Sequence, residues 1–412
     1  MSAISRPRNR VSVLALLILM VCASPSYALR RMIWDGSVLN NGTFLIDFVT
    51  GFNYTSGRSE GKPVRGPTPF LPLVGSTDVD KLYDYYDLIN QYYAEKFGRN
   101  GPNGFGGTST GIHTPLNEMT GYVNGNATLG GAFATWPRNA AEAASSQFRG
   151  STSFTAGWVT PDIVGHETFH IVVNSNWRNP DDSWQVNPDG SWVRLIYQNE
   201  SGALNEGMAD FFGESFERWV TGTNDWLNAA SVDTTLIPQP EMRNLADPLS
   251  AQNPVIDVKY PDRYLSPHFY EGTFDNGGVH INSTIISKTA YLASEGGTFN
   301  GYDVDGIGMD KVEQIFYHAL TTYFDPEETF SGAYQDFLQS TADLYGPTEL
   351  TEMTKALRAV ELHLSRVVPE PSTGILLIAA IIGFFVNRTR RRLPYERTDT
   401  ESTLPVGRNP RR

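Results

Sequence analysis

The chain has 412 residues, enough for two ordinary domains together with targeting segments. Hydrophobic residues make up 40% and aromatic residues 12% of it, which excludes a chain that is disordered throughout. The formal net charge is −13 even though arginines gather near both ends, so the body between them is acidic and a poor candidate for binding nucleic acid.

Residues 1–28 have the pattern of a secretory signal peptide. Arginines at positions 6, 8 and 10 precede an apolar run over 11–22, and Ala28 ends a stretch that fits a cleavage site. The apolar run is short for a membrane span, which disfavours an uncleaved anchor. The only cysteine, Cys22, lies in this segment, so a zinc site in the exported chain must use histidines and carboxylates.

Between the signal and residue 160 the sequence predicts a β-rich lobe, with short alternating runs such as 43–48. One helix is expected inside it, over 79–97, where apolar and tyrosine residues recur at helical spacing and indicate core. Helical patterns then dominate, over 161–175, 200–220, 280–296, 308–324, 330–345 and 348–365. We therefore expect an α+β fold with a β-rich lobe over 29–160, a helical lobe over 161–366 and a ligand cleft at their junction.

The first helix of the second lobe carries His166-Glu167-Thr168-Phe169-His170. Thr160 fits the N-cap position and Pro161 the first helical position. Because His166 and His170 are one turn apart, both imidazoles reach one side of the helix, where they can bind Zn²⁺. Glu167 stands beside them to take a proton from the water that zinc activates. Chance is the alternative explanation of so short a pattern, so a third ligand is needed.

The segment 197–210 supplies a candidate for that ligand. Glu206 and Asp210 are one helical turn apart among Leu204, Met208 and other apolar residues, so both carboxylates are expected to be buried. A buried carboxylate needs a partner such as a metal. Glu206 is the predicted third zinc ligand, and Asp210 can hold the ring of one ligand histidine, although the sequence does not say which.

A further histidine follows the Gly277-Gly278 turn, near the start of a helix. A cationic His280 could stabilise an oxyanion, with Asp275 holding its ring and raising its pKa. Taken alone, a structural histidine would be the simpler interpretation.

The C-terminal segment 367–392 combines Val368-Pro369-Glu370-Pro371-Ser372, an apolar run of about 13 residues and an arginine cluster. The run is short for a ~30 Å bilayer core. This order resembles the PEP-CTERM sorting signal, which implies processing by an exosortase-type enzyme at the envelope. The basic tail 393–412 continues past the usual end of that signal, so a plain membrane anchor with a disordered tail stays open.

Together these motifs resemble the thermolysin family of zinc metallopeptidases. The resemblance rests on Tyr-Gln-Asn-Glu-Ser-Gly-Ala at 197–203, on Asp-Asn-Gly-Gly-Val-His at 275–280 and on the zinc-ligand pattern, is strong from 160 onward and is diffuse over 36–130. It implies a two-lobed thermolysin-like fold with the active-site helix at the junction. It also implies one catalytic zinc ion bound by His166, His170 and Glu206.

The resemblance assigns the remaining roles. Glu167 matches the general base, Tyr197 and His280 match the oxyanion donors, and Asp275 and Asp210 match the carboxylates that orient the rings. For the substrate it implies that Arg243 binds a carbonyl and that Ala132 lies on the edge strand beside the substrate. It also implies an apolar pocket for the residue after the cut, formed by Phe154, Ile163 and Met242.

Several features depart from the family pattern. Asp162, Glu217 and Asp225 match calcium-binding carboxylates, but Leu227 and Ala230 stand where two more are expected, so one Ca²⁺ is predicted at most. Gly131 replaces an asparagine on the substrate edge, and 176–192 reads as an inserted surface loop. A mature-like sequence from Arg30 follows the signal almost at once, so we expect unaided folding or another form of latency.

The leading hypothesis is an exported, monomeric zinc endopeptidase acting on proteins or peptides, with an apolar preference after the cut. Two alternatives are a catalytically weak or inactive zinc-containing surface domain that binds partners, and a structural protein of the biofilm matrix, which only the tail suggests. The retained base and oxyanion donors argue for the enzyme. Nucleic acid is not an expected partner, and membrane association is expected only through the C-terminal segment.

Overall fold

The computed structural model describes residues 30–35, 55–59, 77–110, 117–125, 131–144, 150–179, 183–232 and 243–364. All of them fall in one compact unit that ends at Ser365. The expected signal peptide, the strand at 43–48, Met242 and the sorting segment with its tail lie outside the described residues. Among the described residues, no helix is both long and apolar enough to cross a membrane.

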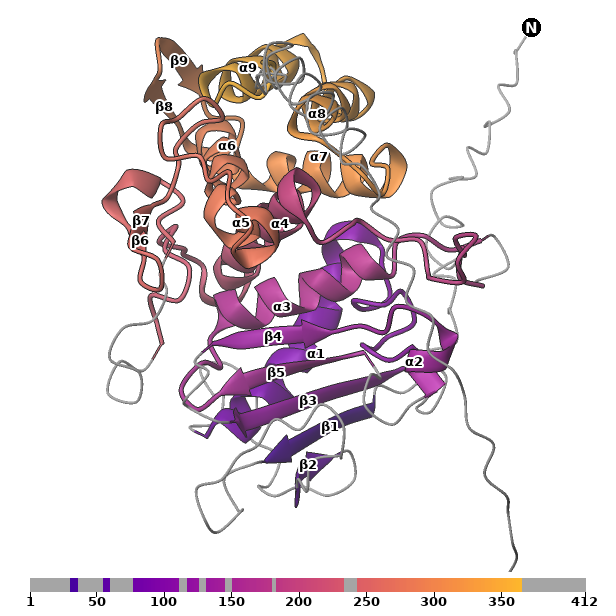
Figure 1. Cartoon of the computed structure of the whole chain (residues 1–412). Helices are drawn as coiled ribbons and strands as arrows, with labels where there is room; N and C mark the ends of the chain where they lie inside the picture. Colours follow the sequence, from indigo (N-terminus) through magenta and orange to yellow (C-terminus); the bar gives the residue numbers. More distant parts are fainter. Residues whose placement is uncertain are drawn as a thin grey trace, which may run out of the picture. The chain divides into compact units, whose positions relative to one another are not determined.

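A five-stranded sheet with the order β2-β1-β3-β5-β4 forms the lower part of Figure 1. The three central strands are parallel, namely β1 (Arg30–Asp35), β3 (Glu118–Gly125) and β5 (Ser151–Thr155). Both outer strands, β2 (Thr55–Ser59) and β4 (Ala132–Thr135), run antiparallel to their neighbours. β4 is therefore an edge strand.

The helix α1 (Asp78–Phe97) packs against the sheet through the tyrosine-rich stripe that the sequence predicted as core. Its start is capped by Thr77, whose hydroxyl accepts from the Asp80 N–H, and its end by Gly98 in the left-handed conformation. The buried Tyr86 hydroxyl donates to the Thr120 carbonyl at 2.9 Å, which joins the helix to β3. The prediction of a core helix here is confirmed.

The helical part packs above the sheet, and α3 (Pro161–Asn174) and α4 (Asn199–Thr221) form its base (Figure 1). These two helices approach closely because glycines meet at their contact. A Cβ on Gly165 would lie 2.9 Å from the Gly213 Cα, and one on Gly213 would lie 2.4 Å from the Asp162 carbonyl oxygen. The close approach brings the metal-binding pattern of α3 directly against the carboxylates of α4.

The remaining helices follow the predicted order with ends shifted by a few residues. They are α5 (Asp275–Asn282), α6 (Thr284–Glu295), α7 (Met309–Thr322), α8 (Phe330–Leu344) and α9 (Pro347–Ala359). The helix expected over 280–296 is thus divided into α5 and α6. Residues 276–278, at the start of α5, have positive φ angles, as the predicted glycine turn requires.

Smaller elements complete the described chain. They are α2 (Ala140–Ala144), the short 3-10 helix η1 (Pro248–Ser250), and the hairpins β6 (Gln252–Asn253) with β7 (Val258–Lys259) and β8 (Gly296–Phe299) with β9 (Tyr302–Asp305).

The expected surface loop at 176–192 contains ordered aromatic packing. Asn179 and Asn187 each donate a backbone N–H to the carbonyl four residues ahead, at 2.8 Å. The rings of Trp184 and Trp192 stack with centroids 4.5 Å apart, and Trp136 packs edge-on against both. Trp184 and Trp192 of this loop therefore pack against Trp136, which directly follows β4.

Candidate metal centre

The helix α3 places His166 and His170 one turn apart on the side that faces α4. Its start follows the prediction in position but not in mechanism. Thr160 occupies the N-cap, yet its hydroxyl donates to the Asp162 carboxylate instead of capping a backbone N–H. The helix is buried almost throughout, and Phe169 stacks on Phe212 of α4 with ring centroids 4.1 Å apart. Packing rather than capping thus fixes the two histidines.

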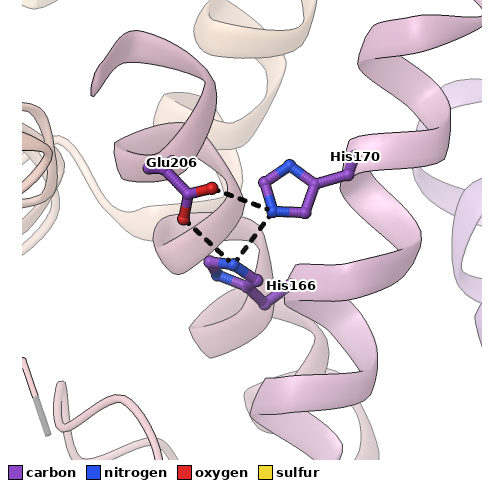
Figure 2. A group of neighbouring side chains, drawn as sticks. All are labelled: His166, His170 and Glu206. Atoms are coloured by element: carbon purple, nitrogen blue, oxygen red, sulfur yellow. Dashed lines mark hydrogen bonds and ion pairs between the residues drawn. The ribbon is translucent and has the colours of Figure 1, made fainter. Parts of the chain in front are cut away.

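Glu206 of α4 faces both imidazoles, as Figure 2 shows. The Nε2 atoms of the two histidines are 3.1 Å apart, and each lies 3.3 Å from one carboxylate oxygen of Glu206. All three residues are at least nine-tenths buried, and Glu206 Oε2 has no hydrogen-bond partner. Two imidazoles and a carboxylate that converge in this way could hold a metal ion. Their chemistry fits Zn²⁺.

Each histidine is oriented by a partner at its other ring nitrogen. His166 Nδ1 lies 3.0 Å from Asp210 Oδ1, and His170 Nδ1 donates to Asn205 Oδ1 at 2.8 Å. Both Nε2 lone pairs are therefore directed toward Glu206, as metal ligation needs. The structure thus answers the question that the sequence left open, because Asp210 pairs with His166. Sequence reasoning missed Asn205, although it directly precedes Glu206.

Charges in this cluster favour a cation. Burial opposes ionisation of Glu206, but the neighbouring His280, His170 and His166 outweigh it and hold the pKa of Glu206 well below its usual range. Burial lowers the pKa of His170 to about 4. It would lower that of His166 too, but Asp210 and Glu206 raise the pKa of His166 to about 10. A metal that binds here therefore displaces a proton from His166.

Glu167 is buried next to His166, and its Oε2 has no hydrogen-bond partner. Burial, the largest influence, raises the pKa of Glu167 to about 7. A carboxylate with that pKa can both accept and return a proton near neutral pH.

Tyr197, His280 and Asp275 meet on the exposed side of the cluster. The Tyr197 hydroxyl donates to Glu206 and lies 3.3 Å from His280 Nε2. Asp275 accepts from His280 twice, from Nδ1 at 2.6 Å and from the backbone N–H at 2.8 Å. Burial lowers the pKa of His280, but Glu206 and Asp275 outweigh it and raise this pKa to about 9. The structure thus brings all these predicted residues together.

The residues expected to contact substrate are only partly assembled. Ala132 on the edge strand β4 pairs with Phe154 of β5, and both Phe154 and Ile163 are buried in the core. The guanidinium of Arg243 is buried and donates to both oxygens of Asp210, at 2.8 and 2.6 Å. Met242 lies outside the described residues.

Two of the three residues predicted to bind calcium, Glu217 and Asp225, lie close together. The carboxylates that could hold a second metal ion are Glu214, Glu217 and Asp225. Asp162 accepts hydrogen bonds from the Thr160 hydroxyl and, at 2.7 Å, from the Ala229 N–H, and its calcium role stays a prediction. Glu214 was missed, although the sequence spacing offered a signal. It lies four residues after Asp210 and three before Glu217, which is the spacing of one helix face.

Fold and site together define a thermolysin-like α+β protein with a candidate zinc centre at the junction of sheet and helices. The comparisons with known proteins agree. Residues 193–362 match the family model of the thermolysin metallopeptidase α-helical domain. The chain is 34% identical over 304 residues to thermolysin from Alicyclobacillus acidocaldarius subsp. acidocaldarius, covering 72% of this chain and 47% of that protein.

Bacillolysin from Bacillus caldolyticus is likewise 34% identical over 304 residues, covering 72% of this chain and 48% of the relative. The chain thus spans about half the length of these curated relatives. The solved structure of the precursor of protealysin, a metalloproteinase from Serratia proteamaculans, superimposes with a TM-score of 0.53 at 20% identity. It covers 81% of this chain and 88% of that one, which supports the fold. These comparisons show that the chain is similar to the thermolysin metallopeptidases, with the family model matching its helical part.

Proposed function

We propose that this protein is an exported zinc endopeptidase. The observation that carries the proposal is the convergence of both histidine Nε2 atoms on the buried Glu206 carboxylate, with Glu167 beside them. A zinc ion bound by His166, His170 and Glu206 would polarise the scissile carbonyl and lower the pKa of a water molecule to ~7.

The other side chains would then act around the scissile bond. Glu167 takes the proton of the attacking water and passes it to the leaving nitrogen, which its pKa of about 7 favours. Tyr197 and His280 donate hydrogen bonds to the developing oxyanion, and Asp275 keeps His280 oriented and protonated. Asp210 holds the ring of His166.

For the substrate we propose backbone pairing along β4 at Ala132 and an apolar preference for the residue after the cut. Phe154, Ile163 and Met242 would line that pocket, and Arg243 would bind a substrate carbonyl while it is held by Asp210. Glu214, Glu217 and Asp225 are proposed to bind one Ca²⁺, because carboxylate oxygens are its preferred ligands.

The terminal segments support proposals about location. We propose export through the signal at 1–28 and retention or sorting through 367–392, with an exosortase-type enzyme as processing partner. The division into lobes at residue 160 and a monomeric state remain predictions.

A binding domain without turnover is the second candidate, and Gly131 is the observation that favours it. This residue leads into the edge strand without a side chain that could bond a substrate, so grip on that side is reduced. The two candidates differ in whether peptide bonds are hydrolysed.

Casein hydrolysis by the purified full-length chain separates them. We expect hydrolysis that a zinc chelator abolishes and added Zn²⁺ restores. The Glu167→Ala variant should keep its zinc and lose about 10²–10⁴-fold in rate, because only proton transfer is removed. A folded, zinc-loaded wild type that is no faster than Glu167→Ala would exclude the peptidase and leave the binding domain.

A further inference from the structure

The loop Asp225–Ala229 connects the two candidate metal sites. At its centre is Asn228, whose side chain is 3% exposed. Asn228 Nδ2 donates to Asp210 Oδ1 at 3.1 Å. The same Oδ1 lies 3.0 Å from His166 Nδ1 and accepts from Arg243 Nη2 at 2.6 Å. Asn228 therefore contacts the carboxylate that orients a predicted zinc ligand, without contacting that ligand itself.

The backbone of this loop is held by the acidic residues around the second site. The Trp226 N–H donates to Glu214 Oε2 at 2.8 Å, and the Leu227 N–H donates to Asp225 Oδ1 at 2.9 Å. Both of these carboxylates belong to the second metal cluster. The Ala229 N–H donates to Asp162 Oδ2 at 2.7 Å. Asn228 is thus flanked on both sides by amides that depend on carboxylates for their position.

The conformation of the loop needs that support. Trp226 and Ala229 have φ angles of 60° and 65°, in the left-handed region that residues with a side chain rarely adopt. Such backbone persists only where surrounding contacts hold it. A shift of the carboxylates in the acidic cluster is therefore expected to alter the conformation of this loop more readily than that of the helices.

The acidic cluster itself is incomplete without a cation. Glu214 is fully buried, and its Oε1 has no hydrogen-bond partner. Burial raises the pKa of Glu214 well above its usual range, and the nearby Asp162, Glu217 and Asp225 add to the effect. A bound divalent cation would coordinate the free oxygen and hold the three carboxylates in one arrangement.

We propose that Asn228 is a positioning residue through which a cation at Glu214, Glu217 and Asp225 stabilises zinc binding. With the cation bound, the loop holds Asn228 against Asp210, and Asp210 keeps the His166 ring in its ligating orientation. Without it, no ion fixes the carboxylates that hold the Trp226 and Leu227 amides, so the loop loosens, Asp210 loses a donor and zinc leaves faster. This inference rests on the zinc and calcium sites of the proposed function and assigns a link between them.

The rate of zinc transfer to a chromogenic chelator tests this link without any measurement of proteolysis. All proteins are full-length and carry Glu167→Ala, which prevents self-cleavage. In that background we expect Ca²⁺ to slow zinc transfer several-fold. Adding Asn228→Ala should speed zinc transfer about tenfold. Removing a hydrogen-bond partner of a metal ligand typically changes metal affinity about 10–100-fold, and we expect the low end because Arg243 still holds Asp210. Calcium should then no longer change the rate.

Asn244→Ala is the matched control, because Asn244 pairs with the same loop but bonds Ser250 and Asp247 instead of Asp210. It should leave both the rate and its calcium dependence unchanged. Asn228→Asp keeps the size of the side chain but turns a donor toward Asp210 into a negative charge. It should speed zinc transfer at least as much as Asn228→Ala, which tests the link should the alanine variant fail to fold.

Terbium luminescence, sensitised by Trp226, reports occupancy of the second site directly. We expect Asn228→Ala to bind Tb³⁺ as tightly as its parent. The proposal is overturned if Tb³⁺ does not bind, if calcium leaves zinc transfer from the parent protein unchanged, or if calcium slows transfer from both Asn228 variants as it does from the parent. None of these outcomes bears on casein hydrolysis, so the peptidase proposal stands or falls separately.

Discussion

Helix α4 carries two pairs of carboxylates whose pKa values are shifted in opposite directions. The first pair is Glu206 and Asp210, and the second is Glu214 and Glu217. Glu206, Asp210 and Glu214 are all within 1% of complete burial, so desolvation acts on each of them. Histidines and Arg243 face the first two and lower their pKa values. Burial raises the pKa values of Glu214 and Glu217, and neighbouring carboxylates add to the effect. At equal burial, a basic partner therefore decides whether desolvation is overcome and the acid is ionised.

The two halves of α4 are therefore suited to different roles. The half with basic partners presents ionised, oriented carboxylates to the two histidines of α3. The half without basic partners holds its charges at a free-energy cost that a proton or a divalent cation can relieve. Both depend on the glycine contact between α3 and α4, which sets the distance between the helices.

The largest effect is expected from a substitution in the first half of α4, which carries Glu206 and Asp210. Glu206→Gln removes the anionic ligand, so zinc should be lost from the purified protein, as measured by metal analysis. Losing the metal removes several kcal/mol of transition-state stabilisation, and casein hydrolysis should fall roughly a thousandfold or more. Glu217→Gln is the matched control on the same helix, because it removes a carboxylate from the other half. Equal zinc loss in the two variants would contradict the comparison.

A smaller effect is expected on stability, where the two halves should respond with opposite signs. Asp210→Asn removes the carboxylate from a buried ion pair with Arg243, which typically costs about 3–5 kcal/mol. Glu214→Gln removes a buried carboxylate that has no basic partner, so in calcium-free buffer the free energy of unfolding should stay equal or rise. Thermal or urea unfolding of the calcium-free proteins measures both. Similar losses from the two variants would show that burial alone governs these acids.

The sequence allowed the first half of α4 to be predicted, but much less of the second. The spacing of His166, His170 and Glu206 fixes which helix faces they occupy, so their convergence follows once two helices pack. Asp210 was predicted as a ring partner for the same reason. Asn228 and Asn205 could not be assigned, because their roles depend on how a loop and a helix end approach the histidines. No local pattern records that approach.

Elsewhere the same limit applies. Most helices after residue 160 were predicted to within two residues from their apolar stripes, although the one expected over 280–296 is divided and α9 ends at Ala359, before the expected 365. The packing of Trp136 against Trp184 and Trp192 was not predicted, since it joins an insertion to a strand end some fifty residues earlier. The hydrogen bonds from Thr160 and Ala229 to Asp162 also went unpredicted, because the second of them comes from a distant loop.

The smallest expected effect is the pH dependence of the stabilisation by calcium. Burial, with Asp162 and Asp225, raises the pKa of Glu217 from 4.5 to about 8 in the calcium-free fold. Because the folded state then holds a proton that the unfolded state has released, this stabilisation is complete below pH 4.5 and is lost as pH rises through about 8. Bound calcium replaces the proton, so its stabilising effect should be small near pH 5 and larger near pH 8.

Melting temperatures with and without calcium at these two pH values test the expectation. At a calcium concentration one hundred times the dissociation constant, linkage gives about 2.7 kcal/mol, or a few degrees in Tm for a chain of this size. Glu217→Gln should abolish most of the difference between the two pH values, because it removes the titrating group. Glu206→Gln should retain that difference, since Glu206 belongs to the half of α4 whose charges already have partners. A calcium effect of the same size at both pH values would mean that the second half of α4 is ionised without a cation, as the first half is.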